Sequence, residues 1–331
     1  MSSPLLEVTE LRKSFKQKAS LLGGSGSSAI PAIDGISFHV NENETLGLVG
    51  ESGCGKTTTG KALLKLNSVD SGKIIYDGQD ITSLSEKAFR PYRSQIQMIF
   101  QDLDAALNPR IRVIDVLREA VKIHHPQLDD AQIDSRVKEL MEMVNLQKGK
   151  LTSYPGELSG GEKRRVGIAR VLAVQPKFIV ADEPTSALDV SIQAQVVNLM
   201  LDLQQKLGLS YLFISHDLHL VEIVSHRIAV MYLGRIVELG SSEQVSKSAK
   251  HPYTQILWSS LSDGSHKEVE KSQSENWGVF DFSRPSSGCR FAPRCPVYHA
   301  RGEPAICRDA NQEPKLTQQG NTGHFVACHF A

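Results

Sequence analysis

The sequence lacks long apolar runs, lacks a charge excess of either sign, and has little cysteine outside its last 43 residues. No stretch approaches the roughly 18–20 apolar residues that a membrane-spanning helix needs, and the first four residues do not begin a secretory signal. The 37 basic and 37 acidic residues cancel, so net charge gives no argument for nucleic-acid binding. We expect a chain of about two domains that neither spans a membrane nor is exported.

Residues 50–57, Gly-Glu-Ser-Gly-Cys-Gly-Lys-Thr, match the G-x-x-x-x-G-K-[ST] pattern of a phosphate-binding loop. An apolar run at 46–49 precedes them and a helix-prone run starting at Thr58 follows. In such a loop, backbone N–H groups surround the phosphates of ATP, Lys56 reaches the β and γ oxygens, and the Thr57 hydroxyl ligates Mg²⁺. The alternative is a glycine-rich turn with solvated side chains. The strand–loop–helix order favours nucleotide binding by Gly50, Glu51, Ser52, Gly53, Cys54, Gly55, Lys56, Thr57 and Thr58.

An apolar run at 178–181 ends in two carboxylates, Asp182 and Glu183. The run has the pattern of a buried parallel strand. Asp182 at its tip can hold the Mg²⁺ shell, and Glu183 can accept a proton from an attacking water or orient it. Two acids after a strand can also be ordinary loop charges. Together with the phosphate loop, they predict ATP hydrolysis.

Residues 158–162, Leu-Ser-Gly-Gly-Glu, precede a basic run, and here the chain resembles the ATP-binding cassette (ABC) family. Ser159, Gly160 and Gly161 can open a helix whose N–H groups face an anion, which gives a second phosphate-binding surface. The resemblance implies that this signature closes over the phosphate loop of a partner cassette, with ATP between the two in a head-to-tail dimer.

The fifth signature residue departs from the family, because Glu162 stands where Gln is usual. This change adds a negative charge and leaves the serine and glycines intact. Taken alone, the pentapeptide has an alternative interpretation as a helix cap followed by a solvated basic face at 163–165.

Further family positions follow in the expected order. Gln101 ends an apolar strand at 96–100 and resembles the Q-loop glutamine, which implies contact with Mg²⁺ and water and a relay to a transmembrane partner. His216 follows the apolar run 211–214 and resembles the switch histidine that contacts the γ-phosphate. A lone histidine after a strand is more often structural, but its place after Asp182 favours the switch role.

Two other positions, Asp189 and Phe15, are compared with functional positions of the family. Asp189, in the Ser-Ala-Leu-Asp segment 186–189, resembles the D-loop that runs along the dimer seam. Phe15 is a candidate aromatic to stack on adenine. The alternative for Phe15 is a core position, and a Gly/Ser-rich insertion at 21–28 separates it from the phosphate loop.

The pattern of elements predicts an α/β fold. Short β-like runs in residues 5–49 predict an antiparallel β patch. Residues 110–170 are helical in pattern, with Asp130 as a plausible N-cap. Strands are also predicted at 73–76 and 96–100, and a first core helix at 58–66. Strands at 178–182 and 211–215, with a helix at 191–206 between them, are predicted to close a doubly wound parallel core. We interpret this as a P-loop NTPase (RecA-like) core with an antiparallel β subdomain and an ABC helical subdomain at about 102–170, forming a domain at 1–255 before an extension at 256–331.

The tail narrows the resemblance to one subfamily. Residues 251–254, His-Pro-Tyr-Thr, are followed by a polar linker at 262–276 and by Ser-Gly-Cys-Arg-Phe-Ala-Pro-Arg-Cys-Pro at 287–296. This order resembles the C-terminal extension of oligopeptide and dipeptide importer ATPases, in particular their F-type subunit.

The resemblance implies a bacterial ABC importer ATPase for peptides or a related small solute, such as a nickel complex. It implies a peripheral place at the cytoplasmic face of the inner membrane. The expected partners are a second, non-identical ATPase, two permease subunits and, indirectly, a solute-binding protein. The alternatives are a soluble ABC ATPase acting on nucleic acid or ribosomes, and an iron–sulfur redox sensor with a vestigial nucleotide site.

Four of the five cysteines lie in the last 43 residues. Disulfides are disfavoured in a cytosolic protein, so this clustering argues for Zn²⁺ or an iron–sulfur centre. The absence of a C-x-x-C pair weakens the zinc interpretation, in which His324 or His329 can replace a thiolate. The third interpretation is thiols that bind no metal and are either redox-inactive or disulfide-forming. The family resemblance implies a [4Fe–4S] cluster, and we predict one held by Cys289, Cys295, Cys307 and Cys328.

Overall fold

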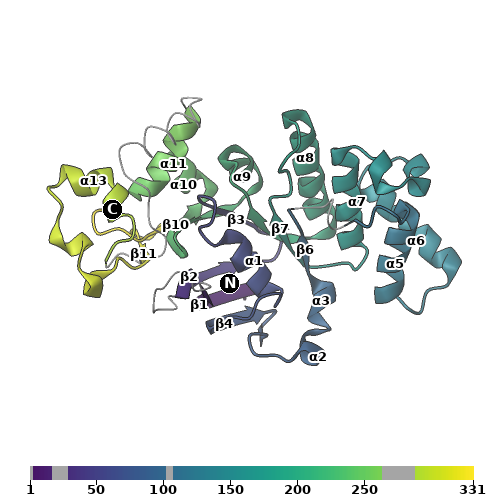
Figure 1. The fold of residues 1–331 in the computed structure, drawn as a ribbon, viewed down its shortest axis with the longest axis horizontal. Helices are drawn as coiled ribbons and strands as arrows, with labels where there is room; N and C mark the ends of the chain where they lie inside the picture. Colours follow the sequence, from purple (N-terminus) through teal and green to yellow (C-terminus); the bar gives the residue numbers. More distant parts are fainter. Residues whose placement is uncertain (1–2, 17–28, 102–106, 263–287) are drawn as a thin grey trace, which may run out of the picture. The chain divides into compact units, whose positions relative to one another are not determined.

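The computed structural model describes residues 3–16, 29–101, 107–262 and 288–331. Figure 1 shows its ribbon. The chain forms two compact units, the first made of residues 1–5, 40–45 and 83–214 and the second of 6–39, 46–82 and 215–331. The predicted insertion at 21–28, residues 102–106 of the predicted helical subdomain, and most of the linker at 262–276 lie outside the described residues.

The first unit contains three parallel strands in the order β8–β7–β6, namely β6 (Ile96–Ile99), β7 (Phe178–Asp182) and β8 (Ser210–Ile214). Every residue of β7 and β8 is buried. Uninterrupted apolar runs suit parallel strands with both faces covered. The strand expected at 178–182 is therefore confirmed. The strands expected at 96–100 and 211–215 are also present, but β6 ends one residue earlier and β8 begins and ends one residue earlier than predicted.

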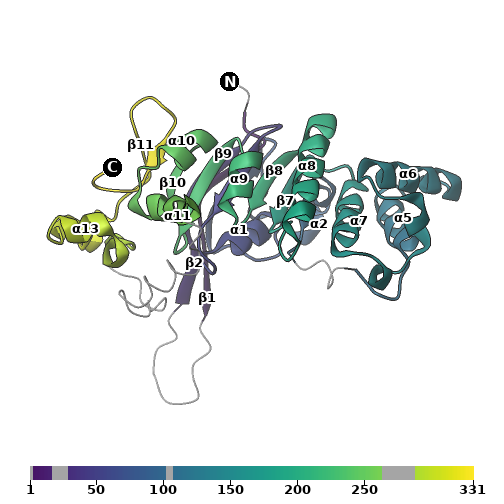
Figure 2. The ribbon, with the colours of Figure 1, turned by 90° about the horizontal axis from the view of Figure 1, so that it is seen from above.

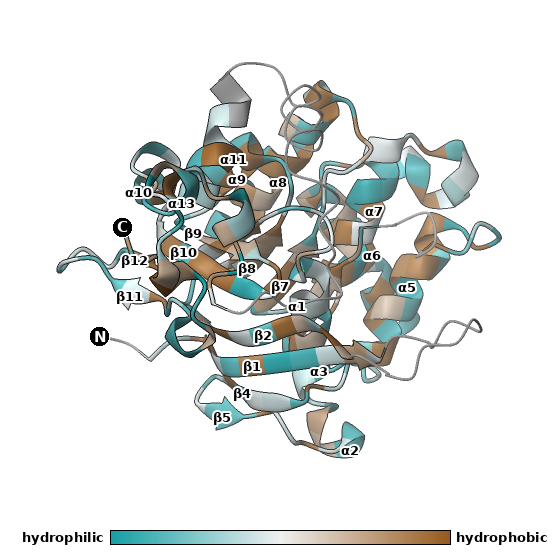
Figure 3. Cartoon of the chain, turned by 60° about the vertical axis from the view of Figure 1, so that its left-hand side comes forward, coloured by the Kyte–Doolittle hydropathy of each residue, from teal (hydrophilic) through white to brown (hydrophobic). Residues whose placement is uncertain are grey.

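Helices α5 (Val113–His124), α6 (Asp130–Met143) and α7 (Gly160–Leu172) lie together in Figures 1 and 2. They bury one apolar face each, and α5 shows both hydrophilic and hydrophobic colours in Figure 3. Other helices in the described part of this unit are α2 (Glu86–Phe89), α3 (Tyr92–Gln95) and α8 (Val190–Leu207), with 3-10 turns at Lys148–Thr152 and Pro155–Glu157.

The predicted start of α6 is wrong by one residue. Asp129, not Asp130, is the N-cap: its carboxylate accepts a hydrogen bond from the Gln132 backbone N–H, and the Gln132 side chain accepts one from the Asp129 N–H. Asp130 is the first helical residue. Two adjacent aspartates compete for this position, and the glutamine three residues after Asp129 decides between them.

The second unit contains an antiparallel sheet in the order β2–β1–β4–β5, which confirms the antiparallel β patch. Its strands are β1 (Leu6–Lys16), β2 (Ala29–Val40), β4 (Ser71–Tyr76) and β5 (Gln79–Asp80). Alternate residues of β1, Leu6 and Val8, are buried, as expected for a strand with one covered face.

Other strands of this unit lie in the order β11–β12–β10–β9–β3. β3 (Thr45–Val49) runs parallel to β9 (Arg227–Tyr232), and β9 forms a hairpin with β10 (Arg235–Ser241). The two-residue strands β12 (Phe325–Val326) and β11 (Thr317–Gln318) extend this sheet in an antiparallel sense. The C-terminal region therefore packs onto the unit that carries the phosphate loop.

Helix α1 (Lys56–Leu63) follows β3, and its predicted bounds of 58–66 are wrong at both ends. It begins earlier because Gly55 adopts the left-handed conformation at the N-cap, and it ends before Lys65, which is also left-handed with φ 54°. Further helices here are α9 (Leu218–Val224), α10 (Ser242–Lys247), α11 (Pro252–Ser262) and α13 (Pro296–Ala300), with 3-10 turns at Ala292–Arg294, Ala305–Cys307 and Ala310–Gln312. Within the described ranges, no helix has the length and apolar character to cross a bilayer.

Candidate nucleotide site

The phosphate loop joins β3 to α1 and depends on glycine at two places. Gly50 has φ 150° and Gly55 has φ 112°, in the region that favours glycine. A Cβ on Gly50 would lie 2.1 Å from the Met231 carbonyl oxygen, and one on Gly55 would lie 2.1 Å from the Ala32 carbonyl oxygen. Because backbone atoms on β9 and β2 are the obstacle, any larger residue would displace the loop.

Lys56 lies inside this loop, with 6% of its surface exposed. Its Nζ donates hydrogen bonds to the carbonyl oxygens of Gly50 at 2.7 Å and Glu51 at 2.9 Å, and lies 3.8 Å from Cys54 Sγ. Burial raises the pKa of the Cys54 thiol, so Cys54 stays neutral beside the ammonium. The loop thus holds one positive charge within its curve, where the sequence predicts phosphate.

The first turn of α1 places the predicted Mg²⁺ ligand next to the loop. Thr57 and Thr58 are partly exposed, whereas Thr59 is buried and donates from Oγ1 to the Gly55 carbonyl oxygen at 3.0 Å. Ser52 and Gly53 are exposed at the tip of the loop. Ser52, Gly53, Thr57 and Thr58 therefore lie on the accessible side of the loop, and the buried Thr59 fixes the helix start.

In the first unit, the end of β7 carries the two predicted carboxylates. Asp182 is buried, and Glu183 is left-handed with φ 46°, a conformation that costs free energy for a residue with a Cβ. The Glu183 N–H donates to the Ile214 carbonyl oxygen at 2.8 Å. Gln101 Nε2 donates to Glu183 Oε2 at 2.9 Å. The structure therefore brings the predicted base and the predicted Q-loop glutamine together.

Ser159 caps α7 and forms a reciprocal pair with the unusual signature residue. Its hydroxyl accepts from the Glu162 N–H at 3.3 Å, and Glu162 Oε2 accepts from the Ser159 N–H at 2.9 Å. Lys150 Nζ lies 3.1 Å from the same carboxylate. The hydrogen bond from the Ser159 N–H is the largest factor that lowers the pKa of Glu162. Glu162 thus stabilises the helix start from the position where the family usually has Gln.

The signature glycines allow close packing against the predicted D-loop. A Cβ on Gly160 would lie 3.2 Å from Leu188 Cδ2, and one on Gly161 would lie 2.7 Å from Ile192 Cγ2. Asp189 is the N-cap of α8, and its carbonyl oxygen accepts from the backbone N–H groups of Ile192 and Gln193. The signature and the D-loop are thus neighbours within one unit.

Arg164 is a residue whose role the sequence reasoning missed. The basic run at 163–165 has a solvated face as its alternative interpretation, but Arg164 is only 5% exposed. Its guanidinium donates to the carbonyl oxygens of Phe100, Gln101 and Ser186, each at 3.2 Å. Arg164 follows the buried Gly161 by three positions and precedes the buried Ile168 by four, so helical periodicity places it on the buried face of α7. This spacing could have been recognised in the sequence. Arg164 ties the signature helix to the Q-loop and D-loop.

His216 and Phe15 both belong to the second unit. His216 is exposed and lies between Ser215 and the α9 N-cap Asp217, whose N–H donates to Ser215 Oγ at 3.0 Å. Phe15 is 45% exposed at the end of β1, with Lys13 Nζ 5.4 Å from its ring centroid. Phe15 is therefore not a core residue, and its ring is available for stacking.

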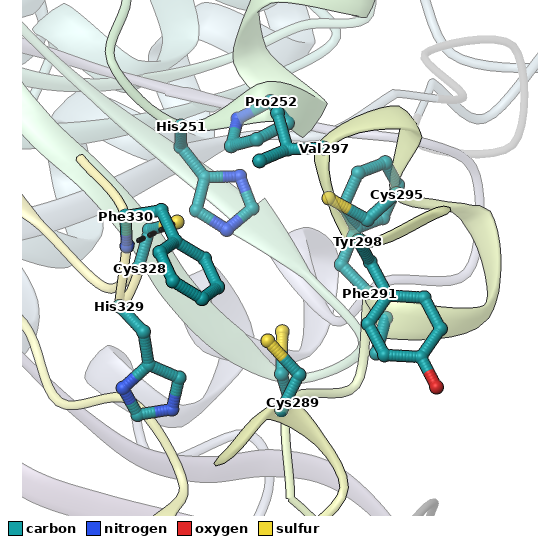
Figure 4. Close-up of a pocket in the computed structure, with 12 residues that line it drawn as sticks. His251, Pro252, Cys289, Phe291, Cys295, Val297, Tyr298, Cys328, His329 and Phe330 are labelled. Atoms are coloured by element: carbon teal, nitrogen blue, oxygen red, sulfur yellow. Dashed lines mark hydrogen bonds between the residues drawn. The ribbon is translucent and has the colours of Figure 1, made fainter. Parts of the chain in front are cut away.

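The four C-terminal cysteines line one small pocket, shown in Figure 4. The labelled Cys289, Cys295 and Cys328 lie on different sides of it, among apolar and aromatic side chains. The Phe330 N–H donates to Cys328 Sγ at 3.4 Å. Within the described residues, all five cysteines are free.

The predicted [4Fe–4S] cluster is wrong. The described residues contain no group of three or more His, Cys, Asp and Glu side chains that could hold a metal ion. Burial raises the pKa of Cys289 to about 11 and also raises the pKa values of Cys307 and Cys328, so these three thiols are neutral in the metal-free pocket. The four cysteines do line one pocket, as their clustering in the sequence indicates, but sharing a pocket does not make them a metal site.

A glycine loop between a parallel strand and a helix, with a lysine inside it, defines a nucleotide-binding protein of the phosphate-loop class. Residues 33–186 match the family described as ABC transporter. Residues 237–301 match the family described as oligopeptide/dipeptide transporter, C-terminal region.

Curated relatives agree over most of the chain. The oligopeptide transport ATP-binding protein OppF of Haemophilus influenzae is 43% identical over 98% of this chain and 96% of its own length. OppF of Streptococcus mutans is 50% identical over 77% of this chain and 83% of its own. The dipeptide transport ATP-binding protein DppF of Lactococcus lactis is 54% identical over 70% of this chain and 74% of its own length.

A solved structure agrees in fold. The cbiO1 protein from Clostridium perfringens, part of the ABC transporter complex cbiONQ, matches with a TM-score of 0.65 and 25% identity, covering 82% of this chain and all of that one. The chain belongs to the ABC transporter family, in its branch of oligopeptide and dipeptide transport ATP-binding proteins. It is an ATPase coupled to transport, which uses ATP and Mg²⁺, and the predicted α/β ABC fold is confirmed.

Proposed function

We propose that this chain supplies the ATP hydrolysis that powers the uptake of dipeptides and oligopeptides. The observation that carries the proposal is the match of residues 237–301 to the C-terminal region of oligopeptide and dipeptide transporters. The relatives named above carry the same assignment over most of the chain. An ATPase that acts on nucleic acid or ribosomes is not favoured by these relatives.

The family implies a membrane permease and a substrate-binding protein as partners, and a peripheral place on the cytoplasmic side of a bacterial membrane. Two permease subunits and a second, non-identical ATPase are the finer composition that we propose. On this basis, the purified chain alone hydrolyses ATP slowly, and co-expression with the second ATPase raises turnover. Rapid hydrolysis by the isolated chain as a symmetric, ATP-dependent dimer would contradict the pairing.

For the chemistry, Lys56 and the N–H groups of the phosphate loop hold the triphosphate, and Thr57 and Asp182 serve Mg²⁺. Bound Mg²⁺ neutralises phosphate charge. Glu183 accepts the proton of the attacking water, and the side-chain amide of Gln101 orients the Glu183 carboxylate. This assignment is supported by the buried ammonium within the loop and by the hydrogen bond between Gln101 and Glu183.

The remaining predicted site residues contact the nucleotide or line the dimer seam. His216 contacts the γ-phosphate and Phe15 stacks on adenine. Ser159 and Gly161 present the start of α7 to the ATP of the partner cassette, and Asp189 lies along the seam. The reciprocal cap at Ser159, which orders the first turn of α7, supports this role.

Uptake measurements test the transport proposal. In the source bacterium, deletion of the gene should abolish uptake of a labelled tripeptide, and wild-type protein should restore it whereas Lys56→Ala should not. Uptake of the corresponding free amino acid is the control and should not change. Unchanged peptide uptake in the deletion strain, with loss of transport of another solute, would replace the peptide assignment.

A further inference from the structure

Arg294, in the C-terminal extension, pairs with Glu51, in the phosphate loop, through two parallel hydrogen bonds. Arg294 Nη1 donates to Glu51 Oε2 at 2.9 Å, and Nη2 donates to Oε1 at 2.8 Å. Both residues belong to the second unit. The side chains are 22% and 38% exposed, so water screens the pair only in part. Bidentate pairs between arginine and carboxylate fix geometry as well as neutralise charge.

Packing holds the guanidinium of Arg294 in place. Its Cζ lies 5.8 Å from the ring centroid of Tyr232 and 5.9 Å from that of Phe291. These two rings pack edge to face at 5.3 Å, and Tyr253 lies 4.6 Å from Tyr232 and 5.4 Å from Phe291. The aromatic cluster joins β9, α11 and the extension, so Arg294 approaches the loop from a rigid support.

Glu51 receives two further contacts through its backbone. Its N–H donates to Tyr253 Oη at 3.0 Å, and its carbonyl oxygen accepts from Lys56 Nζ at 2.9 Å. Tyr253 belongs to the His-Pro-Tyr-Thr segment that marks the transporter branch. One residue of the phosphate loop thus contacts the extension, this segment and the loop lysine.

A second arginine of the extension supports the loop indirectly. Arg290 Nη1 donates to the Leu233 carbonyl oxygen at 2.6 Å, in the turn between β9 and β10. The next residue, Gly234, donates its N–H to the Cys54 carbonyl oxygen at 2.9 Å. The extension therefore contacts the phosphate loop directly through Arg294 and holds the turn behind it through Arg290.

We infer that Arg294 is a positioning residue for ATP binding, which acts by neutralising Glu51 and holding the first turn of the phosphate loop. The inference rests on the proposed role of residues 50–57. Without Arg294, the Glu51 carboxylate would be an uncompensated negative charge at the loop, repelling the triphosphate and competing for the ammonium of Lys56. The C-terminal extension would then be part of the nucleotide-binding machinery.

The test measures the dissociation constant of MgATP for the full chain by titration calorimetry, with thermal unfolding to check folding. Arg294→Ala should weaken ATP binding about tenfold, the size expected for loss of a charge-assisted hydrogen-bonded pair. The loss should be smaller for ADP, which carries less charge. Arg294→Lys keeps the positive charge but cannot form the two parallel hydrogen bonds, and it should weaken ATP binding by a smaller factor than Arg294→Ala. Arg308→Ala removes an exposed guanidinium of the same extension, paired with Glu303, and should bind ATP as wild type does.

The inference attributes the loss of ATP affinity to the unneutralised carboxylate of Glu51. The same Arg294 substitutions are therefore also made in a Glu51→Gln background. There, Arg294→Ala and Arg294→Lys should each change ATP affinity by less than about twofold, because no charge is left to neutralise. If Arg294→Ala does not fold, Arg294→Lys in the two backgrounds decides the question alone. Wild-type affinity in a folded Arg294→Ala or Arg294→Lys chain would overturn the inference, and so would equal losses in the wild-type and Glu51→Gln backgrounds. If the wild-type chain itself does not bind MgATP, the role of the phosphate loop fails instead, a different and separable result.

Discussion

Gln101 Nε2 donates a hydrogen bond of 2.9 Å to Glu183 Oε2, so the glutamine after β6 holds the carboxylate after β7. The left-handed backbone of Glu183 directs this side chain in a way that a regular strand would not. A movement of Gln101 would therefore change the position of the proposed base. This contact offers a physical route from the Q-loop to the hydrolysis step.

Glu183→Gln should keep ATP binding and lower turnover by roughly two to four orders of magnitude, the range for loss of a general base. The amide is nearly isosteric but cannot accept the proton of the attacking water. Single-turnover hydrolysis, measured beside ATP affinity, checks both parts. Gln101→Ala, which leaves the carboxylate in place, should lower turnover less. Hydrolysis by Glu183→Gln at a near wild-type rate would show that another group is the base.

Glu162→Ala should destabilise the chain by about 1 kcal/mol, because it removes one half of the reciprocal cap on α7. Glu162→Gln is the matched control, since its side-chain oxygen can still accept from the Ser159 N–H. Urea unfolding compares the two. Equal losses for Gln and Ala would mean that the negative charge, rather than the cap, stabilises this helix start.

Arg164→Ala should cost about 2 kcal/mol of stability, because a charged donor to three backbone carbonyl oxygens is lost. Turnover should also fall, since those oxygens belong to the segments around Gln101 and Ser186. Arg170→Ala, at an exposed position of the same helix, is the control. Equal stability of the two variants in urea would show that the buried guanidinium contributes nothing.

Burial lowers the pKa of His251 to about 4, below its ordinary value of 6.5. The unfolded chain therefore binds a proton at His251 as the pH falls through 6.5, whereas the folded chain binds it only near pH 4. The free energy of unfolding should fall across this window by roughly 3 kcal/mol at most. His251→Asn keeps an acceptor for the Tyr253 N–H, which donates to His251 Nδ1, and should flatten this part of the pH profile. The free energy of unfolding is measured in urea between pH 4 and 6.5 for both proteins. The same pH dependence in the wild type and in His251→Asn would exclude His251 as the source of that dependence.

Alkylation measures the protonation of the C-terminal thiols. Because burial raises the pKa of Cys289 to about 11, Cys289 should react slowly with iodoacetamide at neutral pH in the folded chain and faster as the pH rises toward that value. In denaturant, all five cysteines should react quickly. Mass spectrometry assigns the label to each residue. Labelling of Cys289 in the folded chain at the rate of free cysteine would contradict its protonated state.

Local patterns were sufficient for the elements that carry the motifs. The phosphate loop, the strand before Asp182 and the cap at Ser159 are each specified within about ten residues, and the structure places them as expected. Element ends were less predictable, because left-handed residues such as Gly55 and Lys65 decide where α1 begins and ends.

Contacts between distant residues could not be predicted in the same way. Glu51 and Arg294 are 243 positions apart, and neither is unusual in its own segment. The cysteine prediction failed for a related reason: spacing showed that the thiols were clustered in the sequence, but whether side chains converge on a metal depends on their arrangement in space, and the described residues contain no group that could hold one. Arg164 was identifiable only by treating its helix face, rather than its charge, as the signal.

The pairing of β12 with β10 has a consequence for synthesis of the chain. Glu238 is fully buried, accepts the backbone N–H groups of Lys250 and His251, and lies 2.7 Å from His324 Nε2, while Val326 is its strand partner. Val326 is made 88 residues after Glu238, which takes roughly 4–18 s at about 5–20 residues per second. For those seconds the nascent chain has an open edge at β10 and a carboxylate without its imidazole. Pairing of that edge with another nascent chain then competes with correct closure of the sheet.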